Sequence, residues 1–381
     1  MLNIDGLPYW RLSGYYFLFF LAIGGFMPYW NLYLQSISMS AEQIGLLSAV
    51  VVVTKIFASP FWGWMVDQYG RRVKLIKLCA LLTTISFAFV LFSDSFWWVF
   101  SVLLVFSIFW SAGLPLIEAT TFSHLQDNTH DYTKIRVWGS ISFIIGVLVL
   151  GKYFDIFPIF HLVPILIFLL GLIWLHSLSL KETQLSTSHV DTESFWNILR
   201  QPSIIFLFVV CFLVQASHGP YYTFFSIYLE ANGYSNSFIG IAWAVGVLAE
   251  VLIYLIIHQA IKRWSLRRLM IMVLILASLR WIMIGLFVDS IILLLLAQCL
   301  HAASFGVYHA VAIQYINREF KGAHQGRGQA LYSSVSFGAG LALGTLVSGF
   351  MWESVGAMET FLFAACLSSL ALIIAIKGLP D

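Results

Sequence analysis

The stretch Gly63-Trp-Met-Val-Asp67-Gln-Tyr-Gly70-Arg71-Arg72 is a short polar segment between two long apolar runs. The runs on either side, near 42–66 and 73–92, are each long enough for an α-helix to cross a bilayer, which takes about 20 mostly apolar residues. Lys and Arg gather in the cytoplasmic loops of membrane proteins, so the arginine pair places the segment on the cytoplasmic side. The segment therefore predicts two membrane-spanning helices joined by a tight, basic turn.

The same alternation of apolar runs and short polar connections extends over the whole chain. Apolar residues make up 60% of the 381 residues and charged residues only 10%, whereas a soluble domain carries about a quarter charged residues. So few charges cannot cover a surface that faces water, and most of the exterior must face lipid. We predict an all-α membrane protein with twelve transmembrane helices in two pseudo-symmetric six-helix bundles. The helices are expected near 12–35, 42–66, 73–92, 96–122, 137–157, 158–180, 203–230, 237–261, 269–287, 290–316, 328–351 and 358–377.

The chain divides into two similar halves around a central polar stretch. We predict a cytoplasmic linker at 181–202, with an N-terminal six-helix bundle at 1–180 and a C-terminal six-helix bundle at 203–381. Residues match between the halves at an offset of 195, as Gly24 matches Gly219. Further matches join Tyr33 to Tyr228, Ile44 to Ile239 and Ala49 to Ala244. A register held over several helices indicates duplicated six-span units, and transporters built from such repeats commonly bind substrate between them.

The distribution of Lys and Arg predicts the orientation in the membrane. Basic residues fall on alternate connections, and only Lys152 breaks the pattern. Both termini are therefore expected on the cytoplasmic side of a bacterial inner membrane, which the chain crosses many times. The connections on the basic side carry Arg71, Arg72, Lys74, Lys77, Lys134, Arg136, Lys181, Arg200, Lys262, Arg263, Arg267, Arg268, Arg318, Lys321 and Arg327.

Composition and spacing also argue against several classes of function. The net charge of +2 and the lack of a long basic run do not favour nucleic acid as a partner. No Gly-rich loop ends in the Gly-Lys-Ser/Thr pattern that cradles phosphates, so we expect neither ATP-driven transport nor a bound cofactor. The four cysteines lie inside apolar segments, and no His, Cys, Asp and Glu cluster has the spacing of metal ligands. We expect no metal site.

The residues of the opening segment suit a charged connection between two helices. Gly63 allows close helix contact, Gly70 allows a tight turn, and Asp67 can cap a helix start or pair with an arginine. We predict a conformational latch made of Gly63, Asp67, Gly70, Arg71 and Arg72. The alternative is a basic loop that only sets the topology. The matching loop of the second half keeps the arginines but lacks the glycines and the aspartate, so the latch is expected in the first half alone.

The spacing G-x-x-x-D-x-x-G-R-R on the basic side resembles the signature loop of the major facilitator superfamily. Other segments narrow the resemblance to the bacterial 3-phenylpropionate transporter branch, a relative of lactose permease and of the nucleoside:proton symporters. The resemblance covers essentially the whole chain and implies the twelve-helix major facilitator fold. The segments that carry it are Pro28-Tyr29-Trp30, Arg136-Val-Trp138-Gly-Ser140, Gln215-x-x-His218-x-x-Tyr221-Tyr222, Ala249-Glu250, Arg280-Trp281, His301 and His309.

Three ionisable residues at membrane depth are candidates for binding substrate or protons. Such residues are costly in a bilayer and are expected to have a partner or a task. Glu250 lies in the middle of the predicted helix 237–261, where a carboxyl group suits proton or substrate binding. Arg280 keeps its charge and suits either a carboxylate cargo or an ion pair with Glu250. Lys55, which is equivalent to Glu250 at the offset of 195, is the other candidate for either task.

Further candidates lie in four other spans. The resemblance to the lactose permease group implies that Glu118 and Arg136 help bind substrate, although Arg136 lies close enough to a loop to be a topology anchor instead. Polar residues on the seventh span are expected on one helix face, directed to the transport cavity. The members of this stripe are Gln215, His218 and Tyr222. In the tenth span, His309 is either a proton-relay group or a satisfied hydrogen-bonding group.

These observations predict a transporter driven by an ion gradient, and carboxyl and imidazole groups favour protons over sodium. The expected function is proton-coupled uptake (symport) of a small aromatic carboxylate such as 3-phenylpropionate by alternating access of the two halves. The expected partners are the small-molecule substrate, protons and membrane lipid, and a monomer is expected to be functional. The alternatives are proton-coupled nucleoside or sugar symport and drug efflux. An intramembrane enzyme would need a nucleophile–base or metal constellation, and a sensor would need a soluble output domain. We find neither in the sequence, so both functions are disfavoured.

Overall fold

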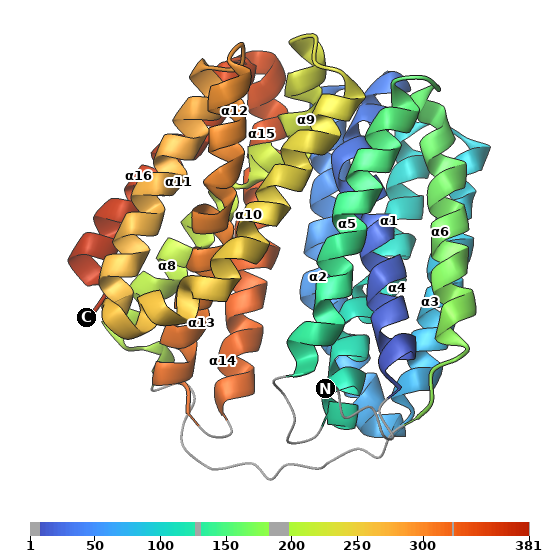
Figure 1. Cartoon of the computed structure of the whole chain (residues 1–381), viewed down its shortest axis with the longest axis horizontal. Helices are drawn as coiled ribbons and strands as arrows, with labels where there is room; N and C mark the ends of the chain where they lie inside the picture. The colour runs from blue at the N-terminus through green and yellow to red at the C-terminus, as the bar shows by residue number, and fades with distance from the viewer. Residues whose placement is uncertain (1–7, 126–130, 183–197, 322–323, 381) are drawn as a thin grey trace. The chain divides into compact units, whose positions relative to one another are not determined.

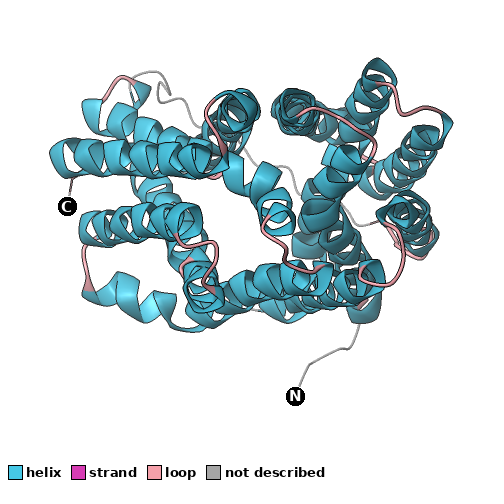
Figure 2. Ribbon diagram, turned by 90° about the horizontal axis from the view of Figure 1, so that it is seen from above, coloured by secondary structure: helices cyan, strands magenta, loops and turns pink. Residues whose placement is uncertain are grey.

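The structure, a computed structural model, describes residues 8–125, 131–182, 198–321 and 324–380. The described chain is helical, with no strand, and holds twelve helices long and apolar enough to cross a membrane. This confirms the predicted all-α fold with twelve spans (Figures 1 and 2). The predicted linker 181–202 lies mostly outside the described residues.

Contacts divide the described residues into two compact units. The first takes in residues up to 39 and from 53 to 182, and the second takes in 40–52 and 198–380. The predicted division at 1–180, 181–202 and 203–381 stays a prediction about the duplicated halves. One long helix, α2 (Ala41–Tyr69), contributes its first turns to the second unit and the rest to the first.

The first unit is a bundle of six spans, with α1 packed against α5 and α6 and α3 packed against α4 and α6. The fifth and sixth spans, predicted to meet at Phe157-Pro158, are separated by a short connection. Besides α2, the elements are α1 (Tyr9–Ser36), α3 (Arg72–Ala88) with η1 (Phe89–Phe92), α4 (Phe96–Leu125), α5 (Tyr132–Phe154), η3 (Ile159–His161) and α6 (Leu162–Ser177).

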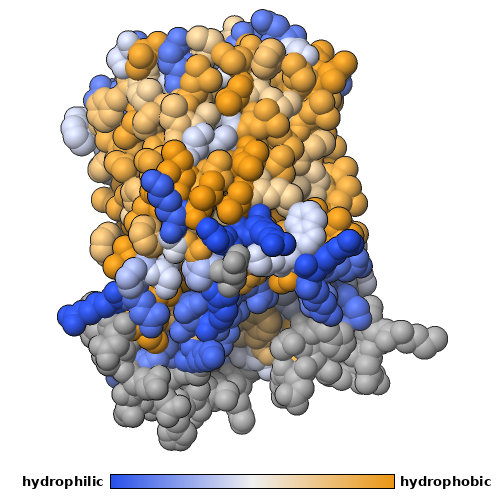
Figure 3. Space-filling model, turned by 90° about the vertical axis from the view of Figure 1, so that its left-hand side faces the viewer, coloured by the Kyte–Doolittle hydropathy of each residue, from blue (hydrophilic) through white to orange (hydrophobic). Residues whose placement is uncertain are grey.

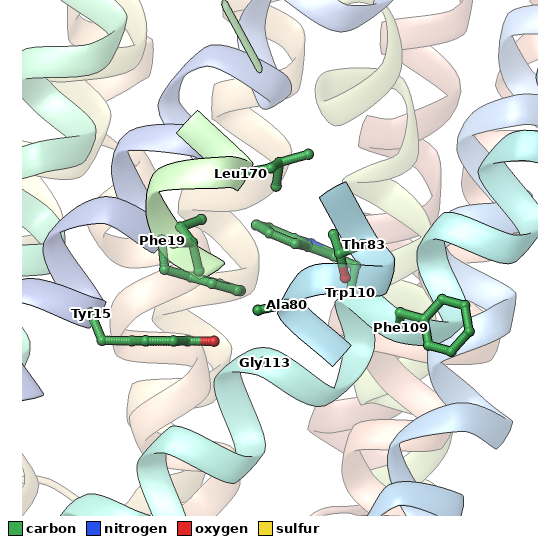
Figure 4. A pocket seen from close by; sticks show the side chains of 9 residues that line it. Tyr15, Phe19, Ala80, Thr83, Phe109, Trp110, Gly113 and Leu170 are labelled. Carbon is green, nitrogen blue, oxygen red and sulfur yellow. The ribbon is translucent and has the colours of Figure 1, made fainter. Parts of the chain in front are cut away.

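Aromatic rings fill the interior of the first unit. Phe19 of α1 and Trp110 of α4 stack with ring centroids 4.3 Å apart and an interplanar angle of 8°. Tyr15 stacks on Phe19 from one turn below, as Figure 4 shows. The cavity beside these rings measures about 10 Å³, which is room for about one water and far too little for an organic solute.

The second unit also has six spans, three of which, the seventh, tenth and eleventh, are built from more than one helical segment (Figure 1). Two short π-helical segments, η4 and η5, interrupt the tenth and eleventh spans. Such segments are uncommon and often occur at functional sites. The elements are α8 (Pro202–Ser217), α9 (Gly219–Ala231), α10 (Asn236–Arg263), α11 (Leu266–Leu286), α12 (Ile291–Cys299), η4 (Ala302–Val307), α13 (Tyr308–Glu319), α14 (His324–Ser333), η5 (Ser334–Gly340), α15 (Leu341–Ser354) and α16 (Ala357–Gly378).

Glycines bring the eleventh span into close contact with the seventh. A Cβ atom added to Gly340 would lie 2.5 Å from the carbonyl oxygen of Phe212, and one added to Gly344 would collide with the carbonyl oxygen of Ala216. Small residues at helix interfaces allow the backbones of membrane helices to approach closely. The close packing of the eleventh span on the seventh therefore depends on these two glycines.

The first turns of α2 pack on α15 within the second unit. A Cβ atom on Gly45 would lie 2.9 Å from the Cα atom of Gly349, so two glycines make this contact. The backbone N–H of Ala41, at the start of α2, donates to a carboxylate oxygen of Glu353 at 2.6 Å. A carboxylate at a helix N-terminus satisfies a free N–H and complements the helix dipole.

The outer surface of the second unit is apolar over a broad band. Figure 3 shows hydrophobic residues over most of one face, with hydrophilic residues gathered toward one end. Leu255 of α10 and Ile292 of α12 are among the exposed apolar side chains. Such a band matches the hydrocarbon layer of a membrane, which cannot solvate exposed polar groups.

Candidate functional site

Arg280 is the centre of a buried polar cluster in the second unit. It lies on α11, is 0% exposed, and donates from Nε to the carbonyl oxygen of Ala297 at 3.1 Å. Its Nη1 donates to Ser304 Oγ at 3.1 Å and its Nη2 to Gln298 Oε1 at 3.5 Å. The described partners of this guanidinium are thus neutral, and the predicted ion pair with Glu250 is not among them.

Two aromatic rings cover the guanidinium of Arg280. Its Cζ atom lies 4.2 Å from the ring centroid of Tyr221 and 4.4 Å from that of Trp281. Tyr221 also donates its hydroxyl to Gln298 Oε1 at 2.9 Å, so ring and amide hold each other in place. Cation–π contacts stabilise a charge most where water is excluded. The cluster is therefore a preformed, water-poor environment for a positive charge.

Glu250 lies beside a histidine. Its carboxylate is 3.7 Å from Nε2 of His301, and the Glu250 side chain is 20% exposed. Gly306 gives the pair room, because a Cβ there would lie 3.3 Å from Glu250 Cγ, whereas a Cβ on Gly246 would make only an ordinary contact with the imidazole of His301 at 3.6 Å. A carboxylate next to an imidazole is an arrangement that can exchange a proton.

The predicted stripe on the seventh span is interrupted. The span is continuous as a membrane crossing, but α8 ends at Ser217 and α9 begins at Gly219, with Pro220 in its first turn. His218 lies at the break, between Gln215 near the end of α8 and Tyr222 in the first turn of α9, and its ring still stacks on that of Tyr222 at 5.9 Å. Proline lacks the N–H that would continue the hydrogen-bond ladder, which explains the interruption.

Several buried polar atoms around the break have no hydrogen-bond partner among the described residues. His218 is fully buried with its Nδ1 2.8 Å from the carbonyl oxygen of Val214, which leaves Nε2 as the unpartnered atom. Its ring lies 4.9 Å from Trp281 and 6.5 Å from His301. A buried polar atom without a partner is costly, so such a group points to a ligand or water. The unpartnered atoms are Gln215 Nε2 and Oε1, His218 Nε2, Gln298 Nε2 and His301 Nδ1.

His309 lies farther along the tenth span. Its Nδ1 is 3.0 Å from the hydroxyl of Tyr332 on α14, so it has a hydrogen-bond partner. The ring of Phe305 stacks between His301, at 5.2 Å, and His309, at 6.4 Å. The two imidazoles therefore share a helix face, but an apolar ring separates them.

The first unit holds a separate, smaller cluster around Glu118 and Arg136. The hydroxyl of Tyr132 donates to Glu118 Oε1 at 3.0 Å. The Arg136 guanidinium carbon lies 3.9 Å from the ring centroid of Phe20 and 5.8 Å from that of Tyr16. Among the described residues no ion pair within 4 Å joins Glu118 to Arg136, so the structure brings the predicted pair near one set of aromatic rings without direct contact.

Lys55 lies in the part of α2 that belongs to the first unit, and its side chain is exposed. Its described neighbourhood offers it no carboxylate within ion-pair distance. The predicted pairing of Lys55 with Glu250 stays a prediction, because the two residues belong to different units.

The predicted latch segment connects α2 and α3. Gly70 has a φ of +62°, a conformation that favours glycine, so the expected tight turn is present. No described atom lies within 4 Å of a Cβ added to Gly63, so the expected close helix contact is absent. Asp67 is exposed and does not cap α3; it interacts electrostatically with Arg72, without an ion pair within 4 Å among the described residues.

Arg72 connects the latch segment to the fourth span. Its Nη1 donates to the carbonyl oxygen of Ala119 at 2.9 Å and to Ser123 Oγ at 2.8 Å. Glu182 accepts from the backbone N–H of Val73 at 3.0 Å and so caps the start of α3. The charged contacts of this turn therefore hold helix ends together inside the first unit.

Sequence reasoning missed four residues that complete these clusters. Gln298 and Ser304 bind Arg280, Tyr132 binds Glu118, and Phe20 covers Arg136. Gln298 is a polar residue inside an apolar run three residues before His301, which is a signal that the sequence offered. The other three are common residue types in membrane helices, and only tertiary contacts single them out.

Comparison with known proteins finds similar transporters over most of the chain. Residues 9–363 match the MFS_1 like family. The chain is 32% identical over 357 residues to the "Probable 3-phenylpropionic acid transporter" of Escherichia coli strain K12, which covers 91% of this chain and 92% of that relative. It is 26% identical to the "Maltose permease" of Geobacillus stearothermophilus, over 92% of this chain and 90% of that one. A crystal structure of a mutant of the nucleoside transporter NupG has the same fold, with a TM-score of 0.88, 18% identity and coverage of 98% and 100%.

Proposed function

The chain belongs to the MFS_1 like family of major facilitator superfamily transporters, and from this premise we propose that it takes up a small aromatic carboxylate together with protons. The observation that carries the proposal is Arg280, a fully buried cation whose described partners are all neutral. A buried charge without a counter-ion is destabilising, and an anionic cargo would supply that counter-ion. The relative named as a probable 3-phenylpropionic acid transporter suggests 3-phenylpropionate as the first cargo to test.

The aromatic surroundings of Arg280 suit the rest of such a cargo. Tyr221 and Trp281 lie on the guanidinium, and His218 lies edge-on to Trp281 at 4.9 Å. Aromatic rings pack favourably in edge-to-face and offset arrangements, so a phenyl group next to its carboxylate fits this wall. An arginine fork also binds a carboxylate through two parallel hydrogen bonds.

Proton coupling is proposed for Glu250 and His301. Their side chains approach to 3.7 Å, and the carboxylate keeps some exposure while the imidazole is buried. A proton bound at this pair would change the charge next to the Arg280 cluster, because Tyr221 lies 5.8 Å from the ring of His301. Cargo and proton would thereby depend on each other's binding.

A second candidate is symport of a neutral polar solute such as a nucleoside or a sugar. The amide of Gln215 favours it, because both its donor and its acceptor are buried and without a described partner. A hydroxyl-rich cargo would satisfy both atoms, whereas a carboxylate could only accept.

Other elements of the function are proposed from charge and motif. We propose that both termini lie on the cytoplasmic side of a bacterial inner membrane, that the monomer is functional, and that the two halves alternate in access to the two sides. The segment around Gly70 and Arg72 would act as a conformational latch in that cycle, with Glu118, Arg136 and Lys55 supporting cargo binding and His309 a second proton group.

The deciding experiment is uptake into proteoliposomes with an imposed proton gradient. Labelled 3-phenylpropionate should accumulate, and a protonophore should abolish the accumulation. Uptake of a labelled nucleoside or maltose in place of the acid would refute the proposed cargo. Accumulation of the acid that ignores the protonophore would refute the coupling.

A further inference from the structure

We propose that Gln298 is the residue that positions an anionic cargo on Arg280, by donating a fixed N–H from its side-chain amide to the cargo carboxylate. The inference rests on the proposed function and deepens it, because it names a specificity-determining residue in the binding site. Gln298 lies next to the last residue of α12, directly before the irregular part of the tenth span.

The orientation of the Gln298 amide follows from its neighbours. A guanidinium can only donate hydrogen bonds, so the group that faces Arg280 Nη2 at 3.5 Å must be the amide oxygen. The hydroxyl of Tyr221 donates to the same oxygen at 2.9 Å. Rotating the amide by half a turn would place its NH₂ group against the guanidinium, donor facing donor. Arg280 and Tyr221 therefore hold the amide in one orientation.

This orientation leaves the amide nitrogen as a donor without a described acceptor. Gln298 is 0% exposed, and its Nε2 has no hydrogen-bond partner among the described residues. A buried N–H₂ group without an acceptor is costly, and burial prevents bulk water from compensating it. The structure thus keeps a donor in place beside a buried cation.

The two groups complement a carboxylate better than any neutral cargo. Arg280 donates to Ala297, Ser304 and Gln298, which together do not use all five of its N–H groups. A carboxylate accepts several hydrogen bonds and is therefore satisfied by the remaining guanidinium donors and the amide N–H together. An amide or alcohol in the same place would bring a donor of its own against these donors.

The exchange Gln298→Glu tests the inference with almost no change of shape. The introduced carboxylate would pair with Arg280, so the protein should remain folded, but the donor becomes an acceptor and a negative charge. We expect KM for 3-phenylpropionate to rise by about 10-fold or more, because a hydrogen bond to a charged group is lost and the introduced carboxylate also repels the cargo and competes with it for Arg280. We expect the neutral analogues 3-phenylpropanamide and 3-phenylpropanol to lose much less, so the preference for the acid should fall.

The matched control is Ser304→Ala, which removes another hydrogen bond to Arg280 of similar geometry. It loosens the guanidinium without changing a donor that would face the cargo, so the acid-over-amide preference should stay near that of the wild type. Tyr221→Phe frees the amide to rotate and should lower the preference partway. Binding of each labelled compound to purified protein in detergent, with thermal unfolding as a folding check, gives the same comparison without transport.

Each outcome decides a separate point. A wild-type protein that does not bind 3-phenylpropionate refutes the proposed cargo and, with it, this inference. Gln298→Ala removes the donor without adding a charge and should also lower the preference for the acid. A wild type that prefers the acid while Gln298→Glu and Gln298→Ala keep that preference refutes the role of Gln298 alone. An equal loss in Ser304→Ala and Gln298→Ala would show that Gln298 only supports Arg280, which also overturns the inference.

Discussion

Both units place an arginine against aromatic rings, but the two arginines differ in their burial and in the charged groups near them. In the first unit Arg136 is partly exposed over Phe20, and the nearby Glu118 is bound by Tyr132. In the second unit Arg280 is fully buried, and the acid of that unit, Glu250, lies against His301 instead. The first cluster is balanced by local charges and solvent, whereas the second keeps a cation whose described partners are neutral. The comparison indicates that a buried cation with only neutral partners is the stronger candidate for binding an anion.

Replacing each of the two arginines by glutamine should give the largest difference in transport activity. Arg280→Gln is expected to lower kcat/KM for 3-phenylpropionate by about 30-fold or more, because truncating a buried charge pair costs 2–5 kcal/mol or more. Arg136→Gln, at a partly exposed site, should cost about 5-fold or less. Initial rates of uptake, normalised to protein that elutes as a single peak in size-exclusion chromatography, measure both. Equal losses would break the contrast between the clusters.

Replacing Glu250 and replacing Glu118 should affect different steps of transport, rather than the same step to different extents. Glu250→Gln should abolish accumulation driven by a proton gradient while keeping exchange of labelled for unlabelled cargo, because exchange needs no net proton movement. Glu118→Gln should keep driven accumulation and raise KM, since its carboxylate interacts with Tyr132 and not with a histidine. Counterflow and gradient-driven uptake are measured on the same vesicles. A Glu118 variant that loses coupling would move the proposed proton site to the first unit.

Replacing the aromatic rings that contact the two arginines should have smaller effects on KM, and the effect should be greater at the more buried site. Tyr221→Leu is expected to raise KM about 30-fold, because a desolvated cation–π contact is worth about 2 kcal/mol or more. Phe20→Leu should raise KM only about 2- to 5-fold, as expected for a contact of about 0.5–1 kcal/mol at an exposed site. Michaelis–Menten analysis of uptake separates the two. If Phe20→Leu has the greater effect, the cargo is bound mainly in the first unit.

A glycine outside both clusters should give the smallest effect. Gly63→Ala adds a methyl group where no described atom lies within 4 Å, so neither Tm nor transport should change measurably. Gly70→Ala should cost about 1 kcal/mol or more, because φ is +62° there and alanine is strained in that region. Thermal unfolding in detergent measures both changes. A clear loss of transport in Gly63→Ala without a change in Tm would show that Gly63 makes its contact in another conformation of the latch.

The fold was predictable from the sequence because hydrophobic length and loop charge are local signals. The twelve apolar runs, the arginine pair at 71–72 and the Gly70 turn are all present in the structure. The stripe of Gln215, His218 and Tyr222 was predicted on one helix, and the structure divides that helix at Gly219-Pro220 while His218 still stacks on Tyr222.

The site was predictable only as far as its charges. Arg280 and Glu250 are conspicuous in apolar helices, but their partners come from other spans. Gln298 and His301 come from the tenth span, and Ser304, another partner of Arg280, lies in its π-helical segment, which shifts the usual helical register. A periodicity of 3.6 residues cannot predict contacts made across such a segment.

The shared helix α2 has a consequence for any attempt to separate the halves. A chain cut between 181 and 202 would divide the sequence at its most polar stretch, yet the second fragment would lack residues 40–52, which pack with it. Gly349 would lose the glycine it packs against, and Glu353 would lose the N–H of Ala41. The two fragments should therefore be unstable when produced singly and should recover when expressed together.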